Sequence, residues 1–143
     1  GHLVFSTMHT NDSISSLSRL YDLGVEGFEI ADALSLIISQ KLIRILCPHC
    51  KKNVRPEESI LQHYGLDKGG VYFERVGCTS CFHTGYMTQK AVFEFLDVDE
   101  DIKNMIISNN LKIENITLIS IKDEIKKLVQ SGLTDIEEMV KYI

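Results

Sequence analysis

The sequence of 143 residues lacks an excess of positive charge, an uninterrupted hydrophobic run and a visible secretory signal. Fifteen Lys and Arg residues against twenty Asp and Glu give a formal net charge of −5, which disfavours a globally basic nucleic-acid-binding protein. The most apolar stretch, residues 28–46, contains Asp32, Gln40, Lys41 and Arg44, and is therefore too polar to span a bilayer. With 44% apolar and 24% charged residues, the chain can bury a core, and we expect one domain, or one domain with a small appended module.

The sequence also lacks an initiator methionine, an internal repeat beyond its paired cysteine motifs and any low-complexity segment. It begins at Gly1 and enters an apolar run at once. We therefore expect the chain to be a piece of a longer protein.

Hydrophobic patterning in the first third predicts one strand and two helices. Residues 2–8 are rich in strand formers and suit a strand buried on both faces, as in a parallel sheet. Residues 14–21 are apolar at helical spacing, and Gly24 follows where a left-handed cap would end the helix. Residues 27–46 predict a longer helix that is apolar over more than one stripe, which is typical of a core element.

The remainder predicts short elements on either side of a cysteine-rich region. The expected helices lie at 56–64, 99–108 and 120–130, with Gly132 just past the last of these, and the expected strands lie at 71–76 and 91–96. Thr134 and Glu137 have the spacing of a capping box, which predicts a final helix ending at Ile143. These elements divide the chain into residues 1–46, a cysteine-containing subdomain at 47–90 and a strand with helices at 91–143.

Four cysteines form two C-x2-C motifs, Cys47 with Cys50 and Cys78 with Cys81, separated by 27 residues. Each motif can supply two thiolates to one tetrahedral ion at a metal–sulfur distance of about 2.3 Å for zinc. Four thiolates leave no open position, so we expect a structural and not a catalytic Zn²⁺, which holds residues 51–77 to the rest of the chain.

Other readings of the cysteines stay open. Two disulfides would require an oxidising compartment, a thioredoxin-like centre would require only one C-x2-C motif at a helix start, and iron uses the same ligands as zinc. His49 and His83 could each replace a sulfur ligand, although four thiolates already complete the set. Zinc is the favoured ion.

Two charged clusters have simpler interpretations than a binding site. Five basic residues lie between positions 41 and 55 without an intervening acid, and they suit a solvated face, a partner subunit or, less well, nucleic acid: Lys41, Arg44, Lys51, Lys52 and Arg55. Five acidic residues lie on and just after the strand expected at 91–96, and we interpret them as solvated charges near a helix N-terminus in preference to a metal or glycosidase site: Glu94, Asp97, Asp99, Glu100 and Asp101.

The predicted strand at 2–8 is followed by His9, Thr10 and Asn11. In open α/β sheets, ligands bind at the carboxyl ends of strands, so these side chains could hydrogen-bond a phosphate or orient a water molecule. A histidine at a strand end is also often only a structural hydrogen-bonding group.

The first twelve residues, G-H-L-V-F-S-T-M-H-T-N-D, resemble the histidine box of the secretion and pilus-assembly ATPases of the GspE/PilB type. The resemblance continues in order along nearly the whole chain, in R-L-Y-D-L-G-V-E at 19–26, Q-K-L-I-R-I-L-C-P-H-C at 40–50, G-C-T-S-C-F-H-T-G-Y at 77–86, F-E-F-L at 93–96 and S-G-L-T-D-I-E-E-M-V at 131–140.

This resemblance implies the C-terminal part of a RecA-like α/β P-loop ATPase domain, with a tetracysteine zinc-binding subdomain and a helical C-terminus. It implies a homohexamer at the cytoplasmic face of the inner membrane, where ATP hydrolysis with Mg²⁺ drives pilus or pseudopilus assembly through a platform protein. Nucleic-acid binding and direct membrane insertion are not expected. His2 and His9 match the nucleotide-sensing histidines, Arg19 and Arg44 match basic positions linked to nucleotide binding, and the four cysteines match the zinc ligands.

Several departures limit what the chain does alone. It contains no G-x4-G-K-S/T phosphate-binding loop and no acidic strand end of the Walker B kind, so we expect it to be catalytically inactive without the upstream part of such an ATPase. Met8 replaces the usual Leu, Gly27 replaces a frequent Pro, and Thr88 and Gln89 replace a frequent Gly-Arg pair. The alternative is a free-standing zinc-ribbon adaptor that binds protein or nucleic acid.

Overall fold

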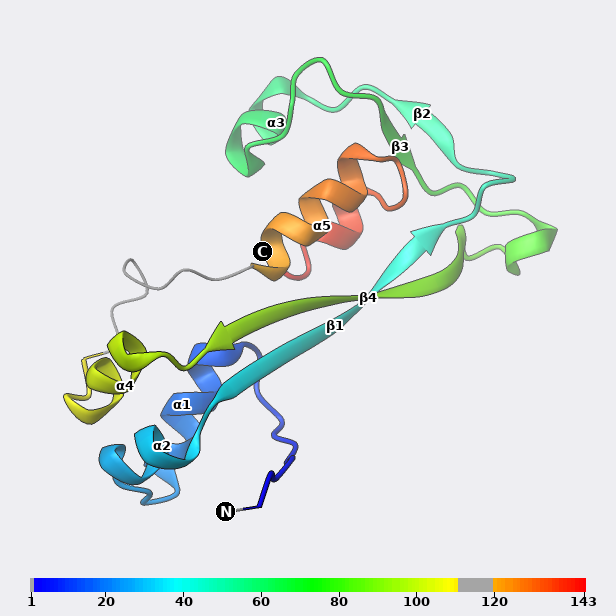
Figure 1. The fold of residues 1–143 in the computed structure, drawn as a ribbon. Coiled ribbons are helices and arrows are strands. Elements are labelled where there is room, and N and C mark those ends of the chain that lie inside the picture. Colours follow the sequence, from blue (N-terminus) through cyan, green and yellow to red (C-terminus); the bar gives the residue numbers. More distant parts are fainter. Residues whose placement is uncertain (1, 111–119) are drawn as a thin grey trace. The chain divides into compact units, whose positions relative to one another are not determined.

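The computed structural model describes residues 2–110 and 120–143, which form two units. The first unit contains residues 2–40 and 93–110, and the second contains residues 41–92 and 120–143. The chain passes between the units within two long strands, β1 (Leu36–Leu46) and β4 (Tyr86–Asp97), which are hydrogen-bonded neighbours (Figure 1). The mixed α/β class predicted from the sequence is confirmed.

Helix α1 (Ser13–Asp22) begins and ends where the sequence predicts it. The Asp12 carboxylate accepts a hydrogen bond of 2.7 Å from the backbone N–H of Ser15, which satisfies one donor of the first turn. Gly24 follows the last turn with φ of +84°, a left-handed conformation that costs glycine little. The helix therefore has both ends encoded locally.

The core of the first unit lies between α1, helix α2 (Gly27–Ala33), helix α4 (Glu100–Ile107) and the end of β4. Asp99 caps α4 by accepting a hydrogen bond of 2.9 Å from the N–H of Ile102. The buried residues of this core are Leu17, Ile30, Ala31, Leu96, Val98, Ile102 and Ile106.

The second unit is built around helix α5 (Ile121–Gln130) and the short helix α6 (Ile136–Met139). Helix α3 (Glu58–Tyr64) and an antiparallel pair of short strands, β2 (Lys52–Val54) and β3 (Tyr72–Glu74), complete it. Its buried core residues are Ile43, Leu61, Leu66, Tyr72, Val92, Ile121, Ile125, Leu128, Val129 and Met139. None of the described helices is long and apolar enough to cross a membrane.

The prediction of a buried strand at residues 2–8 is wrong for this structure. The segment has no assigned strand, and its side chains are exposed, with 87% of Phe5 accessible to solvent. A strand forms only where a neighbouring strand pairs its backbone groups, and the described residues provide none for this segment.

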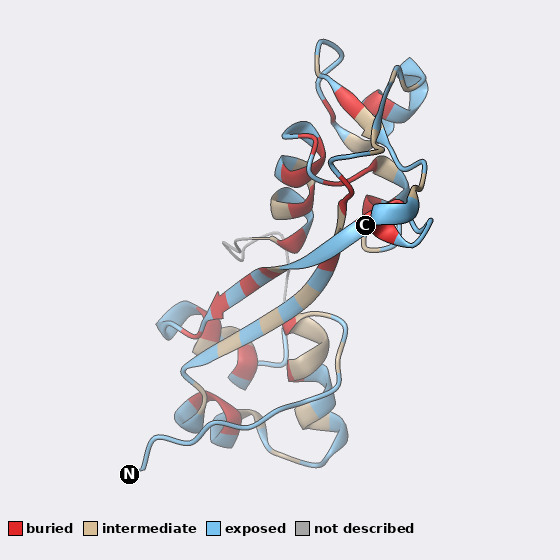
Figure 2. Cartoon of the chain, turned by 90° about the vertical axis from the view of Figure 1, so that its right-hand side faces the viewer, coloured by how far each residue is buried: buried red, intermediate tan, exposed pale blue. Residues whose placement is uncertain are grey.

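The prediction of one long helix over residues 27–46 is also wrong. Helix α2 ends at Ala33, Leu34 turns into extended conformation with ψ of +126°, and residues 36–46 form β1. A mostly apolar run can fit both periodicities, and the β-branched isoleucines at 37, 38, 43 and 45 favour a strand once β4 supplies the pairing. In Figure 2, buried and exposed residues alternate along the Ala91–Asp97 part of β4, as expected for a strand with two different faces.

The predicted capping box at residues 134–137 is replaced by a different cap. Asp135 is the N-cap of α6 and accepts a hydrogen bond of 2.7 Å from the N–H of Glu138, whereas the Thr134 hydroxyl donates to the carbonyl of Arg44 at 2.8 Å. The helix ends at Met139 and not at Ile143. Because the Thr134 hydroxyl donates to the Arg44 carbonyl, the N-cap of α6 lies one residue further along, at Asp135.

Candidate metal centre

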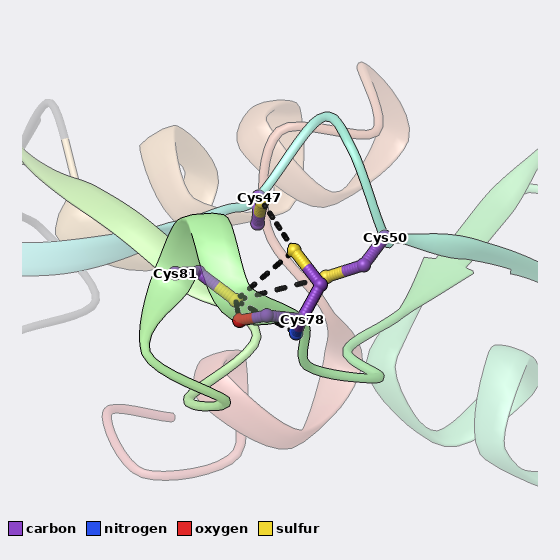
Figure 3. Close-up of side chains that lie close together, drawn as sticks. All are labelled: Cys47, Cys50, Cys78 and Cys81. Carbon is purple, nitrogen blue, oxygen red and sulfur yellow. Dashed lines mark hydrogen bonds between the residues drawn. The ribbon is translucent and has the colours of Figure 1, made fainter.

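The four cysteine sulfurs converge on one point, with all four within 4.8 Å of one another (Figure 3). The Sγ–Sγ distances are 3.9 Å for Cys47–Cys78 and 3.8 Å for both Cys50–Cys81 and Cys78–Cys81. A regular tetrahedron with metal–sulfur bonds of about 2.3 Å has sulfurs about 3.8 Å apart. The donor set therefore fits a four-coordinate metal ion such as Zn²⁺.

Local backbone hydrogen bonds fold each C-x2-C motif into a tight turn. In the first motif, the carbonyl of Cys47 accepts from the N–H groups of Cys50 at 3.4 Å and Lys51 at 3.0 Å. In the second, the 3-10 turn η1 (Thr79–Cys81) is closed by a hydrogen bond of 2.8 Å from the His83 N–H to the Cys78 carbonyl. Each turn directs its two thiols to the same side.

Glycines at both ends of the second motif allow a close backbone approach. Gly77 has φ of +112°, and a Cβ atom there would lie 2.6 Å from the His83 carbonyl oxygen. Gly85 has φ of +78°, and a Cβ atom there would lie 2.6 Å from the Cβ atom of Arg75. A larger residue at either position would therefore displace the loop that carries two of the thiols.

Backbone N–H groups donate hydrogen bonds to two of the sulfurs, and these bonds act to lower the pKa of the two thiols. The N–H groups of Cys78 and Gly85 lie 3.2 and 3.3 Å from the Cys81 sulfur. Burial raises the pKa of the Cys81 thiol, but these donors outweigh it and lower the pKa to about 6. Burial raises the pKa of the Cys50 thiol to about 11, against the opposing effect of the Gly77 N–H. One sulfur is thus prepared as a thiolate, and a bound cation would stabilise the others as thiolates.

The same geometry tests two alternatives for the cysteines, which are disulfide bonds and replacement of a sulfur ligand by a histidine. All four are free cysteines, so no disulfide is formed. Among the described residues, the metal-ligating cluster contains only the four cysteines, and neither His49 nor His83 belongs to it.

The first cysteine motif is attached to the turn that follows α5. The N–H of Leu46 donates to the Leu133 carbonyl at 2.8 Å, and the Lys51 ammonium donates to the Gly132 carbonyl at 2.8 Å. The same ammonium lies 4.3 Å from the centre of the Phe73 ring. The candidate metal centre is therefore part of the second unit's framework and not an appended loop.

Arg44, which was expected to match a basic position linked to nucleotide binding, is paired with a carboxylate in this structure. Its Nε donates to Glu138 at 2.9 Å, and its guanidinium lies 4.1 Å from the centre of the Tyr86 ring. Glu138 is only 1% exposed and also accepts from Lys141 at 2.7 Å. Burial raises the pKa of Glu138, but the hydrogen bonds from Arg44 and Lys141 outweigh it and hold the pKa at about 2.

A second buried carboxylate, Asp135, adjoins this pair. It accepts a hydrogen bond of 2.9 Å from the Tyr86 hydroxyl, and burial together with this contact raises the pKa of Tyr86. Sequence reasoning missed Tyr86, Asp135 and Glu138. The acidic run T-D-I-E-E could have indicated the two carboxylates, because Arg44 on β1 needs a partner once it is partly buried. No such signal indicated Tyr86.

The other residues expected to act in nucleotide binding are not brought together. His2 and His9 lie on the exposed N-terminal segment, and Arg19 is exposed on α1. No hydrogen bond or ion pair joins them in the part of the chain that the structure describes.

The acidic cluster at residues 94–101, on the end of β4 and the start of α4, separates into two kinds of residue. Asp99 is a helix cap, and Asp97, Glu100 and Asp101 are exposed, as predicted. Glu94 differs from the prediction, because it is buried and accepts a hydrogen bond of 3.0 Å from the backbone N–H of Ser13.

Comparison with known proteins identifies the family. A family model described as "Type II/IV secretion system protein" matches residues 1–141. The chain is 38% identical over 93% of its length to the type IV pilus assembly ATPase PilB of Thermus thermophilus, of which it covers 15%. It is 37% identical over its whole length to the type IV pilus assembly ATPase TfpB of Acinetobacter baylyi, of which it covers 26%. It is 32% identical over 99% of its length to the type II secretion system ATPase E of Vibrio cholerae, of which it covers 29%. The chain spans less than a third of each of these relatives and belongs to the type II/IV secretion system protein family.

Proposed function

We propose that this chain forms the C-terminal part of a RecA-like ATPase that drives type II secretion or type IV pilus assembly. The observation that carries the proposal is the family match over residues 1–141 together with the naming of the relatives as ATPases of these two machines. The small share of each relative that the chain covers supports the further proposal that nucleotide-binding elements lie outside it.

In the complete ATPase, His2, His9 and Arg19 would lie beside the nucleotide. The exposed segment at residues 2–8, which is rich in residues that favour strands, suits this role, since it could pair with a sheet supplied by the rest of the domain. The turn after His9 would then lie at the carboxyl end of that strand, where nucleotides bind in α/β sheets. Arg44 is already engaged by Glu138, so we assign it a structural role.

We propose that the four cysteines bind one Zn²⁺, which supplies a rigid tetrahedral cross-link and no chemistry. Cys47 and Cys50 lie at the end of β1, and Cys78 and Cys81 lie before β4, so the cross-link fixes both ends of residues 51–77. Analysis of the metal content of the purified chain by mass spectrometry tests this assignment, with one zinc per chain expected and iron as the contrary result.

We further propose that the complete protein acts as a homohexamer at the cytoplasmic face of the inner membrane, on a platform protein. The names of the relatives, which assign them to pilus assembly and secretion machines, support this proposal. The division into residues 1–46, 47–90 and 91–143 stays a prediction.

The experiment that tests the proposal compares ATP hydrolysis by the isolated chain with that by the full-length protein encoded by its gene. We expect no turnover from the chain and measurable turnover from the full-length protein. Turnover by the isolated chain would place catalysis in these 143 residues and contradict the proposal. A gene without an upstream P-loop, combined with salt-dependent binding of single-stranded nucleic acid, would instead support the zinc-ribbon adaptor.

A further inference from the structure

Glu94 is a buried carboxylate that joins β4 to the beginning of α1. It is 8% exposed, and its Oε1 accepts a hydrogen bond of 3.0 Å from the backbone N–H of Ser13, the first residue of the helix. The N–H groups of a first helical turn lack partners within the helix, and the helix dipole places positive charge there. The carboxylate therefore occupies the position where the helix provides both a donor and a favourable field.

The contact depends on the backbone of Ser13 and not on its side chain. Ser13 is fully buried, yet its hydroxyl oxygen has no hydrogen-bond partner. No Lys or Arg forms an ion pair with Glu94 within the described residues, so the hydrogen bond from Ser13 is its only assigned stabilising contact. A buried carboxylate is costly without such a donor, and this links the position of Glu94 to that of the Ser13 N–H.

Further hydrogen bonds hold the turn between His9 and α1. Asp12 accepts from the N–H of Ser15 at 2.7 Å, and the hydroxyls of Thr10 and Ser16 lie 2.6 Å apart. The Ser39 hydroxyl donates to the Asn11 carbonyl at 3.5 Å. The backbone N–H and the hydroxyl of Ser16 also donate to the Asp12 carbonyl, at 3.2 and 3.1 Å. Of these contacts on residues 10–13, only the one made by Glu94 is buried and reaches the turn from β4.

We infer that Glu94 is a positioning residue, which fixes the turn after His9 so that the imidazole reaches the nucleotide in the complete ATPase. The inference rests on the proposed function of His9. Residues 2–9 are exposed, and the described residues show no hydrogen bond that holds them in place. The conformation of residues 10–13, which join His9 to α1, therefore determines where His9 lies. Glu94 acts on this conformation through the Ser13 N–H.

The first test measures the hydrogen bond between Glu94 and the Ser13 N–H in the 143-residue chain itself. Hydrogen exchange by NMR at the Ser13 amide should accelerate at least 10-fold in Glu94→Ala, because the amide loses its acceptor. Exchange in Glu94→Gln should stay within about 3-fold of the original, because the Gln side-chain oxygen still accepts the bond. Asp97→Asn, an exposed change on the same strand, is the matched control and should leave Ser13 unchanged. Equal exchange in Glu94→Ala and the original chain would overturn the inference.

The second test measures the effect on His9 in the full-length protein. Glu94→Ala should lower kcat for ATP hydrolysis by about 10- to 100-fold with KM within about 2-fold, since His9 would be misplaced by a small distance. Glu94→Gln should restore most of the activity. In a His9→Ala background, Glu94→Ala should cause no further loss, because its effect passes through His9.

A purely structural role predicts the opposite pattern. In that case, the fold-losses in kcat from Glu94→Ala and His9→Ala would multiply in the double variant, and the inference would be overturned. Should Glu94→Ala fail to fold, Ser13→Pro removes the same N–H donor at the first helical position, where proline is tolerated, and it should show the same non-additivity with His9→Ala. Absence of ATPase activity in the unmodified full-length protein would contradict the proposed function, while the exchange at Ser13 would still decide whether Glu94 anchors the turn.

Discussion

Three carboxylates are buried among the described residues, and each is matched to a different kind of donor. Glu94 accepts from a backbone N–H, Asp135 accepts from the Tyr86 hydroxyl, and Glu138 accepts from Arg44 and Lys141. A buried carboxylate without a donor costs several kcal/mol, so each of these pairings constrains where two segments meet. In the second unit, two of the three pairings attach α6 to β1 and β4.

The ion pair of Glu138 predicts a loss of stability at low pH. The pKa of Glu138 in the folded chain is about 2, below the usual value of 4.5, so the stabilisation is complete above about pH 4.5 and disappears as the pH falls toward 2. Glu138→Gln should lower the free energy of unfolding at pH 7 by about 2–4 kcal/mol, because it leaves the partly buried Arg44 without its counter-charge. Urea unfolding at pH 7 and at pH 3 measures both effects, and the two proteins should differ less at pH 3.

The neighbouring Glu137 provides the matched control. Its carboxylate pairs with Arg75 at 2.7 Å, but both side chains are largely exposed. Glu137→Gln should therefore change the free energy of unfolding by less than about 1 kcal/mol. Equal losses in the free energy of unfolding from Glu137→Gln and Glu138→Gln would contradict the prediction that the buried pair stabilises the fold more than the exposed pair.

Gly77 allows a second prediction at the residue scale. Gly77→Ala combines a strained positive φ with a contact of 2.6 Å to the His83 carbonyl, so it should displace Cys78 and weaken zinc binding by at least about 10-fold. Gly24→Ala is the control, because Gly24 also has positive φ but has no atom within 4 Å of the added Cβ. A competition assay with a chromophoric chelator should show unchanged zinc affinity in Gly24→Ala, and equal affinities in both variants would rule out the steric argument.

The helices predicted from the sequence are those whose ends are encoded by local side chains. α1 has Asp12 and Gly24 at its ends, and Asp99 caps the start of α4, so neighbouring residues suffice to define them. β1 could not be distinguished from a helix, because its apolar run fits both periods and only pairing with β4 decides between them. The segment at 2–8 was assigned to a strand by composition, but strand formation depends on a partner that the described residues lack.

The candidate site shows the same division between local and long-range information. The cysteines were predicted because each C-x2-C motif is a local turn, and the pairing of two motifs follows from tetrahedral coordination. The contacts of Arg44 with Glu138 and of Glu94 with Ser13 join residues 94 and 81 positions apart in the chain. Such pairs are specified by the tertiary fold, and composition alone describes both carboxylates as members of exposed acidic runs.

Removal of the metal should act on the elements between the two cysteine motifs. β2, α3 and β3 form the excursion at residues 51–77, whose two ends are held by the thiols. In a chelator, limited proteolysis should cleave within residues 51–77 at least about 10-fold faster, because the ends of the excursion are released. Readdition of zinc should restore protection.

Cleavage in the first unit serves as the internal control for that experiment. α1, α2 and α4 share a core that contains no cysteine, so their cleavage rates should not change in a chelator. Protection of residues 51–77 that is independent of metal would show that the core of the second unit holds the excursion without the cross-link.

At the scale of the whole molecule, the chain contains two cores that have no buried residue in common. One includes Leu17, Leu96 and Ile106, and the other includes Ile43, Ile125 and Met139. Both depend on β1 and β4, which contribute residues to each unit. Ligand binding to one folded unit stabilises that unit by mass action, so the metal should raise the stability of the second core specifically.

The two cores therefore predict two thermal transitions that respond differently to zinc. Four of the five tyrosines, residues 64, 72, 86 and 142, lie in the second unit, so near-ultraviolet circular dichroism reports mainly on it. The chain has no tryptophan, and Phe28→Trp at an exposed position of α2 would provide a fluorescent reporter for the first unit. A chelator should lower the midpoint of the tyrosine transition by about 5 °C or more and leave the tryptophan transition within about 1 °C, because only the second unit contains the thiols. A single transition, seen at the same temperature by both probes and shifted equally by the chelator, would show that the units unfold as one cooperative structure.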